Sequence, residues 1–348
     1  MQIPATMHST VAAIYAARVE RSDDGLRPHL GASLIGHPCS RALWYGFRWV
    51  RKASFDGRTL RLFDRGQREE ARFIEELRWI GCEVSEGPAE GKQWRLSACG
   101  GHFGGSMDAA ALSLPESPAT WHVCEFKTHN TKSFKDLASK GVQESKPQHW
   151  CQMQVYMALS GMDRALYLAA CKDTDELHAE RIHADPAAAK ALLERAEQII
   201  FAAEPPMRIS NDPAWYQCKM CDYSDTCHGT SAPLPTCRSC AHVTPERDGT
   251  WTCEHNHLSA LSVQAQKDGC QAHRYIPILL ENFAECRGGN QDSNTVEYAN
   301  RLNGGRFFNA GFESAYSSIE IFDATDKATL VDVKPLPLDS FADMEIPF

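Results

Sequence analysis

The chain has 348 residues, of which 43% are hydrophobic, which is ample for one main folded domain with appended modules. It contains no run of about 18 apolar residues, and its N-terminus lacks the basic start and small-residue cleavage site of a signal peptide. We therefore expect neither a membrane span nor export, and we place the protein in a bacterial-type cytosol.

The formal net charge of −9 is unevenly distributed along the chain. Residues 41–68 contain eight Lys or Arg against two Asp, a local charge of +6, whereas residues 312–348 contain eight acids against two Lys, a local charge of −6. An acidic C-terminal segment thus masks a basic N-terminal one in the total. A local basic patch is what binding to a phosphate backbone requires, so the total charge does not exclude a nucleic-acid partner.

Hydrophobic periodicity predicts helices first and a strand-rich stretch after them. Residues 10–20 and 38–49 are typical of helices, and residues 62–80 carry apolar side chains at helical spacing. Residues 104–112 and 121–127 favour extended structure, and the turn-like sequence LPESPAT lies between them. We expect these two strands to pair as an antiparallel hairpin.

The middle of the chain repeats this alternation. Residues 147–160 return to helix, and residues 165–171 and 177–183 are predicted to form a second hairpin. A long helix follows from residue 185 to about residue 203, where two consecutive prolines end it. The order helix, strands, helix, strands, helix predicts an α/β fold.

The C-terminal third is rich in cysteines and turns. Residues 231–235 (SAPLP) and 287–293 (RGGNQDS) are interpreted as linkers, and the sequence TVEYANRLNGGRFFN is typical of a small hairpin that turns at Asn303–Gly305. These features predict four parts: a main domain, a cysteine-rich module, a small hairpin-containing region and an acidic tail, at residues 1–230, 231–286, 287–335 and 336–348.

A cluster of acids with one lysine is predicted around the sequence Glu125-Phe126-Lys127. Side chains alternate along a strand, so Glu125 and Lys127 lie on one face while Phe126 points into the core. Asp108 ends the preceding strand close to Glu125, and Glu70 supplies a third carboxylate from a helix. Three acids suit Mg²⁺ or Mn²⁺, and with a lysine they match what phosphodiester hydrolysis needs. The tripeptide alone is more typical of an exposed salt-bridged strand, so the combination carries the prediction.

Taken in chain order, the motifs resemble those of the RecB-like PD-(D/E)XK nucleases, a family that includes the AddB nuclease, the CRISPR-adaptation exonuclease and, more distantly, phage lambda exonuclease. The resemblance implies a restriction-endonuclease-like fold, with a mixed central sheet flanked by helices and a small metal-stapled C-terminal module. It rests on Ser33, Cys39, Arg41, Gly66, Glu70, Asp108, Glu125, Phe126, Lys127, Gln152, Tyr156, Cys218, Cys221 and Cys227.

The resemblance also implies roles for the acidic cluster. Glu70, Asp108 and Glu125 would bind the Mg²⁺ or Mn²⁺ ion, and the carbonyl of Phe126 would be a further ligand. Lys127 would assist the attacking water.

Two further residues and two departures from the motif bear on the same site. Gln152 and Tyr156 lie at i and i+4 of a predicted helix, where both reach the substrate or the catalytic lysine, although ordinary polar helix residues would give the same pattern. Met107 stands where the motif has proline. Glu70 stands where several relatives carry histidine, which leaves the preferred metal open.

Three cysteines in a short segment, Cys218, Cys221 and Cys227, supply three thiolates, and a closed site needs a fourth ligand. From spacing alone, zinc and iron fit these cysteines about equally. In the family that the chain resembles, a far N-terminal cysteine completes a [4Fe–4S] cluster that joins the two ends of the nuclease domain. The resemblance therefore implies that Cys39 is the fourth ligand.

A second group, Cys237, Cys240, Cys253 and Cys270, has the spacing of a structural zinc site made of two knuckles. Free buried cysteines are the alternative, and one thiolate could be replaced by a histidine, for which the candidates are His255, His257 and His273. The other six cysteines are isolated along the chain, and we interpret them as small hydrophobic residues.

The predicted function is a metal-dependent DNA nuclease, an exonuclease acting on ends or single strands in recombination, repair or replication of a bacterium or phage. A structure-specific endonuclease, and a DNA-binding or protein-docking accessory factor, keep the same fold. A redox iron–sulfur protein lacks a flavin or nicotinamide motif. Residues 338–348 resemble the acidic tip of bacterial single-stranded DNA-binding protein, which predicts docking to host proteins that read that tip; a merely solubilising tail is the alternative.

Overall fold

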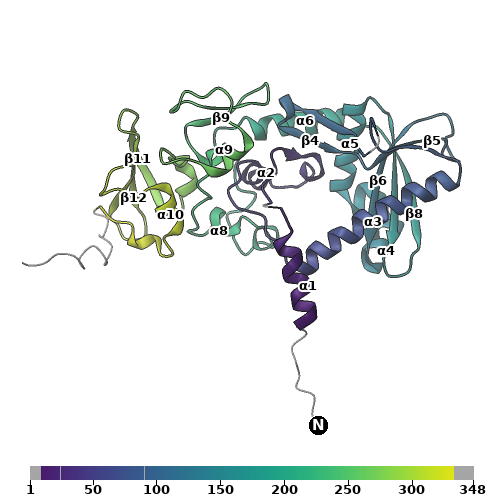
Figure 1. Cartoon of the computed structure of the whole chain (residues 1–348), viewed down its shortest axis with the longest axis horizontal. Coiled ribbons are helices and arrows are strands. Elements are labelled where there is room, and N and C mark those ends of the chain that lie inside the picture. The colour runs from purple at the N-terminus through teal and green to yellow at the C-terminus, as the bar shows by residue number, and fades with distance from the viewer. Residues whose placement is uncertain (1–8, 24, 90, 333–348) are drawn as a thin grey trace, which may run out of the picture. The chain divides into compact units, whose positions relative to one another are not determined.

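The computed structural model divides into two compact units (Figure 1) and describes three stretches of the chain, residues 9–23, 25–89 and 91–332. The first unit contains the described residues up to Ala202 except Arg48–Arg51, together with Arg247–Gly249. The second contains Arg48–Arg51 and the other described residues from Ala203 onward. Across the three described stretches, no helix combines the length and the apolar character that a membrane span requires. The four parts predicted from the sequence stay predictions.

A five-stranded mixed sheet forms the centre of the first unit (Figure 1). The pair β6 and β7 runs parallel, and the other neighbouring strands run antiparallel. The mixed sheet is confirmed, and both predicted hairpins are present as β5–β6 and β7–β8. In sheet order the strands are β2 (Glu83–Ser85), β5 (Ala109–Leu112), β6 (His122–His129), β7 (Arg164–Cys171) and β8 (Leu177–His183).

The helix α3 (Gly57–Trp79) covers one face of this sheet. Its residues Phe73, Ile74 and Leu77 are buried in a cluster with Phe126 of β6, and the rings of Phe73 and Phe126 lie 5.3 Å apart between centroids. Phe126 therefore points into the core, as strand alternation predicts.

α3 begins five residues earlier than hydrophobic periodicity predicts. The side chain of Asp56 accepts a hydrogen bond from the backbone N–H of Thr59 at 2.6 Å, which caps the helix before its apolar face starts. Hydrophobic periodicity detects only the part of a helix that has a buried apolar face. It therefore does not detect a polar first turn.

Two helices, α4 (Thr131–Ser145) and α5 (Pro147–Ser160), form the crossover between the parallel strands β6 and β7. α5 is confirmed where it was predicted, and α4 is an addition to the predicted elements. Parallel neighbours require such a crossover, because a tight hairpin can join only antiparallel strands. The helix α6 (Pro186–Ile200) follows β8 and packs against α5.

The stretch predicted as one strand over residues 104–112 is instead two strands in different sheets. β4 (Phe103–Ser106) pairs with β1 (Leu30–Gly31) and β3 (Arg95–Ala98) in a small sheet, whereas β5 belongs to the central sheet. The break falls at Met107 and Asp108, where the backbone N–H of Met107 bonds the carbonyl of Trp94. Asp108 is thereby released from strand pairing.

The N-terminal helices α1 (Ser9–Glu20) and α2 (Ser40–Phe47) confirm the two predicted there. α1 crosses α3 at Gly57, where an added Cβ would lie 2.3 Å from the carbonyl oxygen of Tyr15. A glycine is needed at that crossing because any side chain would force the two helices apart.

The second unit contains the cysteine-rich segments and a three-stranded antiparallel sheet. The predicted hairpin is confirmed as β12 and β13, but residues 287–293, predicted as a linker, belong mostly to β11 and its turn. β11 pairs with β12 through a register shift between Cys286 and Gly288, which accommodates the glycines that made the sequence resemble a linker. The elements are α7 (Tyr216–Lys219), α8 (Ser224–Cys227), β9 (Val243–Pro245), β10 (Trp251–Cys253), α9 (Val263–Asp268), β11 (Ala284–Asn290), β12 (Thr295–Asn300), β13 (Arg306–Asn309) and α10 (Ser318–Asp323).

Candidate active site

Three carboxylates predicted from the sequence come together in the first unit. Glu125 lies on β6 and is fully buried. Asp108 lies one position beyond the Ala109–Cys124 pair of the β5–β6 register, and its Oδ2 accepts a hydrogen bond from the backbone N–H of Phe126 at 2.8 Å. Glu70 is half-buried on α3, close enough to Asp108 for the two charges to interact.

Lys127 lies among these acids, on the same face of β6 as Glu125. Its ammonium forms an ion pair with Glu125, lies 3.9 Å from Oδ2 of Asp108 and donates a hydrogen bond of 3.0 Å to the carbonyl of Phe126. The alternation predicted for the Glu125-Phe126-Lys127 sequence therefore produces the expected juxtaposition of acid and lysine.

The helix α5 contributes the two polar residues that the motif predicted. Nε2 of Gln152 donates to Oε2 of Glu125 at 2.9 Å and lies 3.4 Å from the hydroxyl of Tyr156. That hydroxyl donates to the carbonyl of Ser106 at 3.0 Å. A Cβ at Gly105 would lie 2.4 Å from the hydroxyl, so a glycine is needed for the small sheet to approach α5.

Burial raises the pKa values of all three acids. Burial, with a further contribution from Asp108, raises the pKa of Glu70 to about 7. Burial also raises the pKa values of Asp108 and Glu125 above their ordinary range, against the opposing charge of Lys127. For Lys127, burial lowers the pKa, but the carboxylates of Glu125 and Asp108 more than offset it, so the net shift is upward. Lys127 is therefore a cation at neutral pH.

The donor chemistry of this cluster fits a divalent cation. Asp108 raises the pKa values of both Glu70 and Glu125, and a hard ion such as Mg²⁺ or Mn²⁺ would relieve this repulsion among three oxygen-donor acids. Among the described residues, however, no group of three or more Cys, His, Asp or Glu side chains is arranged to hold a metal ion as it stands.

A histidine pair beside these residues was missed by sequence reasoning. The hydroxyl of Tyr167 lies 2.9 Å from Nε2 of His129 and 2.8 Å from Nδ1 of His149. Burial lowers the pKa of His129 to about 4 and that of His149 to about 3, with Lys146 and Lys127 respectively contributing next, so both rings are neutral. The alternation of side chains along a strand could have found His129, because it follows Glu125 by four residues and so lies on the same strand face.

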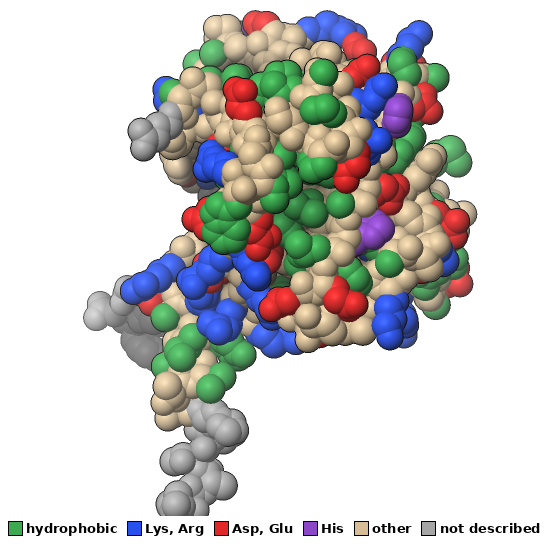
Figure 2. All heavy atoms as spheres, turned by 90° about the vertical axis from the view of Figure 1, so that its right-hand side faces the viewer, with side chains coloured by type: hydrophobic (Ala, Val, Ile, Leu, Met, Phe, Trp, Pro, Cys, Tyr) green, Lys and Arg blue, Asp and Glu red, His purple; other side chains and the backbone are tan. Residues whose placement is uncertain are grey.

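A basic surface was predicted over residues 41–68, and in the structure only some of its basic side chains are exposed. Arg41 and Arg48 are buried, with 5% and 3% exposure, so they cannot contribute. Arg58, Arg61 and other arginines on the first turns of α3 are exposed. Figure 2 shows Lys and Arg side chains gathered on the face next to α1, which packs against α3.

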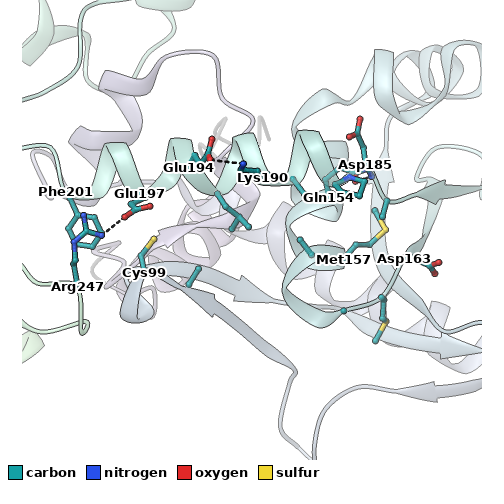
Figure 3. A pocket seen from close by; sticks show the side chains of 18 residues that line it. Cys99, Gln154, Met157, Asp163, Asp185, Lys190, Glu194, Glu197, Phe201 and Arg247 are labelled. Atoms are coloured by element: carbon teal, nitrogen blue, oxygen red, sulfur yellow. Dashed lines mark hydrogen bonds and ion pairs between the residues drawn. The ribbon is translucent and has the colours of Figure 1, made fainter.

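A cavity of about 680 Å³ lies in the first unit, apart from the acidic cluster (Figure 3). It lies between α5 and α6 and is lined by Met157 and Phe201, with ion pairs from Lys190 to Glu194 and from Arg247 to Glu197 among its walls. None of the residues predicted as catalytic lines it. Size alone therefore does not identify the reactive site.

The predicted iron–sulfur ligands are divided between the two units. Cys39 belongs to the first unit, whereas Cys218, Cys221 and Cys227 belong to the second. Within the second unit, the backbone N–H of Cys221 bonds the carbonyl of Cys218 at 3.1 Å in a tight turn. Iron–sulfur ligation by these residues stays a prediction.

The predicted zinc ligands are brought to one place. Four residues of the second unit, Cys237, Cys240, Cys253 and Cys270, line a small cavity of about 120 Å³. His273 lines it too, and His255, one of the other candidates, also contributes to its wall. Within the described part of the chain, these cysteines and histidines are not arranged to hold a metal ion as they stand, so zinc ligation stays a prediction.

Comparison with protein families identifies a family for this chain. The family model of the PD-(D/E)XK nuclease superfamily matches residues 6–228, which include all six predicted catalytic residues. No curated protein matches the chain.

Solved structures resemble the chain at low scores. The crystal structure of SSO0001 is 15% identical, with a TM-score of 0.38, and covers 62% of this chain and 94% of that chain. The alkaline exonuclease LHK-Exo from Laribacter hongkongensis is 17% identical, with a TM-score of 0.37, over 54% of this chain and 90% of that chain. LHK-Exo in complex with dAMP gives the same identity and coverage, with a TM-score of 0.36. Similarity at this level supports no functional argument.

Proposed function

Because this chain belongs to the PD-(D/E)XK nuclease superfamily, we propose that it is a divalent-metal-dependent deoxyribonuclease that hydrolyses phosphodiester bonds as an exonuclease. The observation that carries the proposal is the cluster of Glu70, Asp108, Glu125 and Lys127, with Gln152 bonded to Glu125. An accessory DNA-binding role would not need buried acids with raised pKa values beside a lysine.

Glu70, Asp108, Glu125 and the carbonyl of Phe126 would hold the Mg²⁺ or Mn²⁺ ion, which when bound activates water and neutralises charge on the scissile phosphate. Water attacks the phosphorus, the bond to the leaving oxygen breaks, and overall one proton of the water ends on that oxygen. The products therefore carry a phosphate on one end and a hydroxyl on the other.

Lys127 acts by its charge in this scheme. Its raised pKa keeps the ammonium protonated, so it stabilises negative charge near the attacking water and does not remove the proton. Gln152 fixes the orientation of Glu125 through its hydrogen bond, and Tyr156 fixes α5 on the small sheet through Ser106. These two are positioning residues.

The direct test is digestion of end-labelled linear DNA and of covalently closed circular DNA with Mg²⁺ or Mn²⁺. An exonuclease releases label from linear DNA and leaves the circle intact. Nicking of the circle would favour the structure-specific endonuclease, and binding without cleavage under either metal would leave only the accessory role.

We further propose two metal cofactors: a [4Fe–4S] cluster on Cys39, Cys218, Cys221 and Cys227, and a zinc ion in the cavity that Cys237, Cys240, Cys253 and Cys270 line, where a histidine is the alternative to one of the four thiolates. The first is supported by the motif resemblance, and the second by the cavity that its members share. From the sequence we also propose the RecB-like subtype, a bacterial or phage source and a cytoplasmic location.

The acidic tip, residues 338–348, lies outside the described residues, and its docking to host proteins that read the single-stranded DNA-binding protein is proposed from sequence alone. A labelled peptide of these residues titrated against such a reader, with authentic tip peptide as competitor, tests it. Undetectable binding, or binding that survives deletion of Phe348, would leave the segment as a solubilising tail.

A further inference from the structure

The cavity in the second unit is unequally buried around its four cysteines. Cys237, Cys240 and Cys253 are buried, with exposures of 8%, 4% and 6%, whereas Cys270 is exposed. Sγ of Cys270 lies 3.9 Å from Nδ2 of Asn256, which also lines the cavity. Burial therefore distinguishes three of the four thiols from that of Cys270.

Local backbone structure fixes the positions of these three thiols. Cys237 and Cys240 lie on one short turn, in which the N–H of Cys240 bonds the carbonyl of Cys237 at 3.2 Å. Cys253 ends β10, opposite Val243 of β9, and exchanges two backbone hydrogen bonds with Leu258. Pairing of β9 with β10 therefore places a second turn, carrying Cys253, beside the first.

His273 also lines the cavity and is only 3% exposed. Its Nε2 lies 3.1 Å from the hydroxyl of Ser239, which also lies within hydrogen-bond distance of the carbonyls of Leu234 and Thr236. The hydroxyl of Ser239 has one proton to donate, and the two carbonyls can only accept. We therefore assign this proton to a hydrogen bond with one of the carbonyls. The hydroxyl oxygen of Ser239 therefore accepts from His273, whose proton is on Nε2.

This tautomer leaves Nδ1 of His273 with a bare lone pair. Nδ1 is buried and has no hydrogen-bond partner, and a buried acceptor without a donor is costly. Histidines that bind a metal through one ring nitrogen characteristically donate from the other to a fixed acceptor, which here is Ser239. The arrangement is thus that of a metal ligand already oriented from behind.

We propose that Nδ1 of His273 and the thiolates of Cys237, Cys240 and Cys253 are the four ligands of a structural Zn²⁺ ion, and that Cys270 is not a ligand. One nitrogen and three sulfurs in a tetrahedron suit zinc, and binding releases three protons as the three thiols ionise. The four side chains line one cavity but, within the described part of the chain, are not arranged around an ion as they stand, so binding would require them to rotate toward it. The site is independent of the nuclease proposal.

Metal analysis of the full chain and three variants tests this ligand set. The wild type and Cys270→Ser are expected to carry one zinc per chain, and His273→Ala to bind zinc at least tenfold more weakly. His273→Cys should restore zinc, which excludes simple misfolding as the cause of the loss. Loss of zinc from Cys270→Ser, or full retention by His273→Ala, overturns the ligand set.

Substitution of zinc by cobalt shows how many of the ligands are thiolates. The thiolate-to-cobalt absorbance grows with the number of bound sulfurs, so it should be equal in the wild type and Cys270→Ser and higher in His273→Cys. A lower absorbance in Cys270→Ser would show a four-sulfur site and refute the proposal. DNA cleavage is measured on the same preparations, so a failure of the zinc site and a failure of the nuclease remain distinguishable.

Discussion

Nε2 of Gln152 donates a hydrogen bond to Oε2 of Glu125 at 2.9 Å, and both side chains are buried. This bond anchors the crossover helix α5 on the strand that carries the central carboxylate. It leaves the other oxygen of Glu125 to the ammonium of Lys127.

Replacing Gln152 by Ala is expected to lower kcat by about tenfold or more, because a buried carboxylate oxygen without its donor costs about 1–3 kcal/mol and turns freely. Gln154→Ala is the matched control. Gln154 bonds the carbonyl of His183 and the N–H of Asp185, so its loss should lower the melting temperature and spare kcat. Equal kcat values for the two variants would contradict the positioning role.

Asp108→Ala, Glu125→Ala and Lys127→Ala are each expected to abolish cleavage while the protein stays folded, because each removes a metal ligand or the fixed cation. Loss of one such group is expected to reduce kcat by about 10²-fold or more. Lys140→Ala, on the exposed side of α4, serves as the control. Circular dichroism and a cleavage assay suffice, and full activity in any two of the three variants would refute the assignment.

The raised pKa of Glu70, about 7 against an ordinary 4.5, predicts an unusual pH dependence of stability without metal. Between these values the folded protein keeps a proton that the unfolded chain has lost, so the free energy of unfolding falls as pH rises through this window. Added Mg²⁺ competes with that proton, and its stabilising shift in Tm should be larger at about pH 8 than at about pH 5. Glu70→Gln should weaken this dependence. The same Tm shift at both pH values would disprove it.

Charge reversal on the first turns of α3 is expected to weaken the salt dependence of DNA binding. Arg58→Glu with Arg61→Glu should reduce the slope of log K against log salt by about 0.9 for each phosphate of duplex DNA that these arginines neutralise in the wild type. Lys190→Glu on α6, which is also exposed, is the control. An unchanged slope in the α3 variant would move the DNA path to another face.

Anaerobically purified protein is expected to be brown, with the broad visible absorption of thiolate-bound iron clusters. Cys39→Ser should bleach it, because one of four ligands is then removed. Cys286→Ser, at an exposed cysteine outside both groups, should leave the colour unchanged. Colourless protein that contains zinc alone would replace the cluster by a second zinc site.

The sequence was sufficient for those parts of the site that depend on local periodicity. The period of two along β6 predicted that Glu125 and Lys127 share a face with Phe126 opposite. The spacing of four predicted that Gln152 and Tyr156 share a helix face, and Nε2 of Gln152 lies 3.4 Å from the hydroxyl of Tyr156. These relations are fixed by strand and helix geometry alone, and they hold in any fold.

Other features depend on contacts between segments far apart in the chain. The break at Met107 is imposed by the carbonyl of Trp94, and the pairing of His129 with His149 needs the hydroxyl of Tyr167 from a third element. No local pattern encodes such contacts. The crossover helix α4 was missed because its need arises from the parallel pairing of β6 and β7, which the sequence does not show.

The strand–helix–strand unit from β6 through α5 to β7 also has a kinetic consequence. It carries Glu125, Lys127, Gln152 and Tyr156 on one uninterrupted segment, so their mutual contacts close only short loops of chain. Short loops close at small entropic cost and early in folding. A nascent chain that has left the ribosome as far as Cys171 therefore already contains the segment that arranges these four residues, and Asp108 lies before that segment. At this stage, no residue of the second unit beyond Arg51 has left the ribosome.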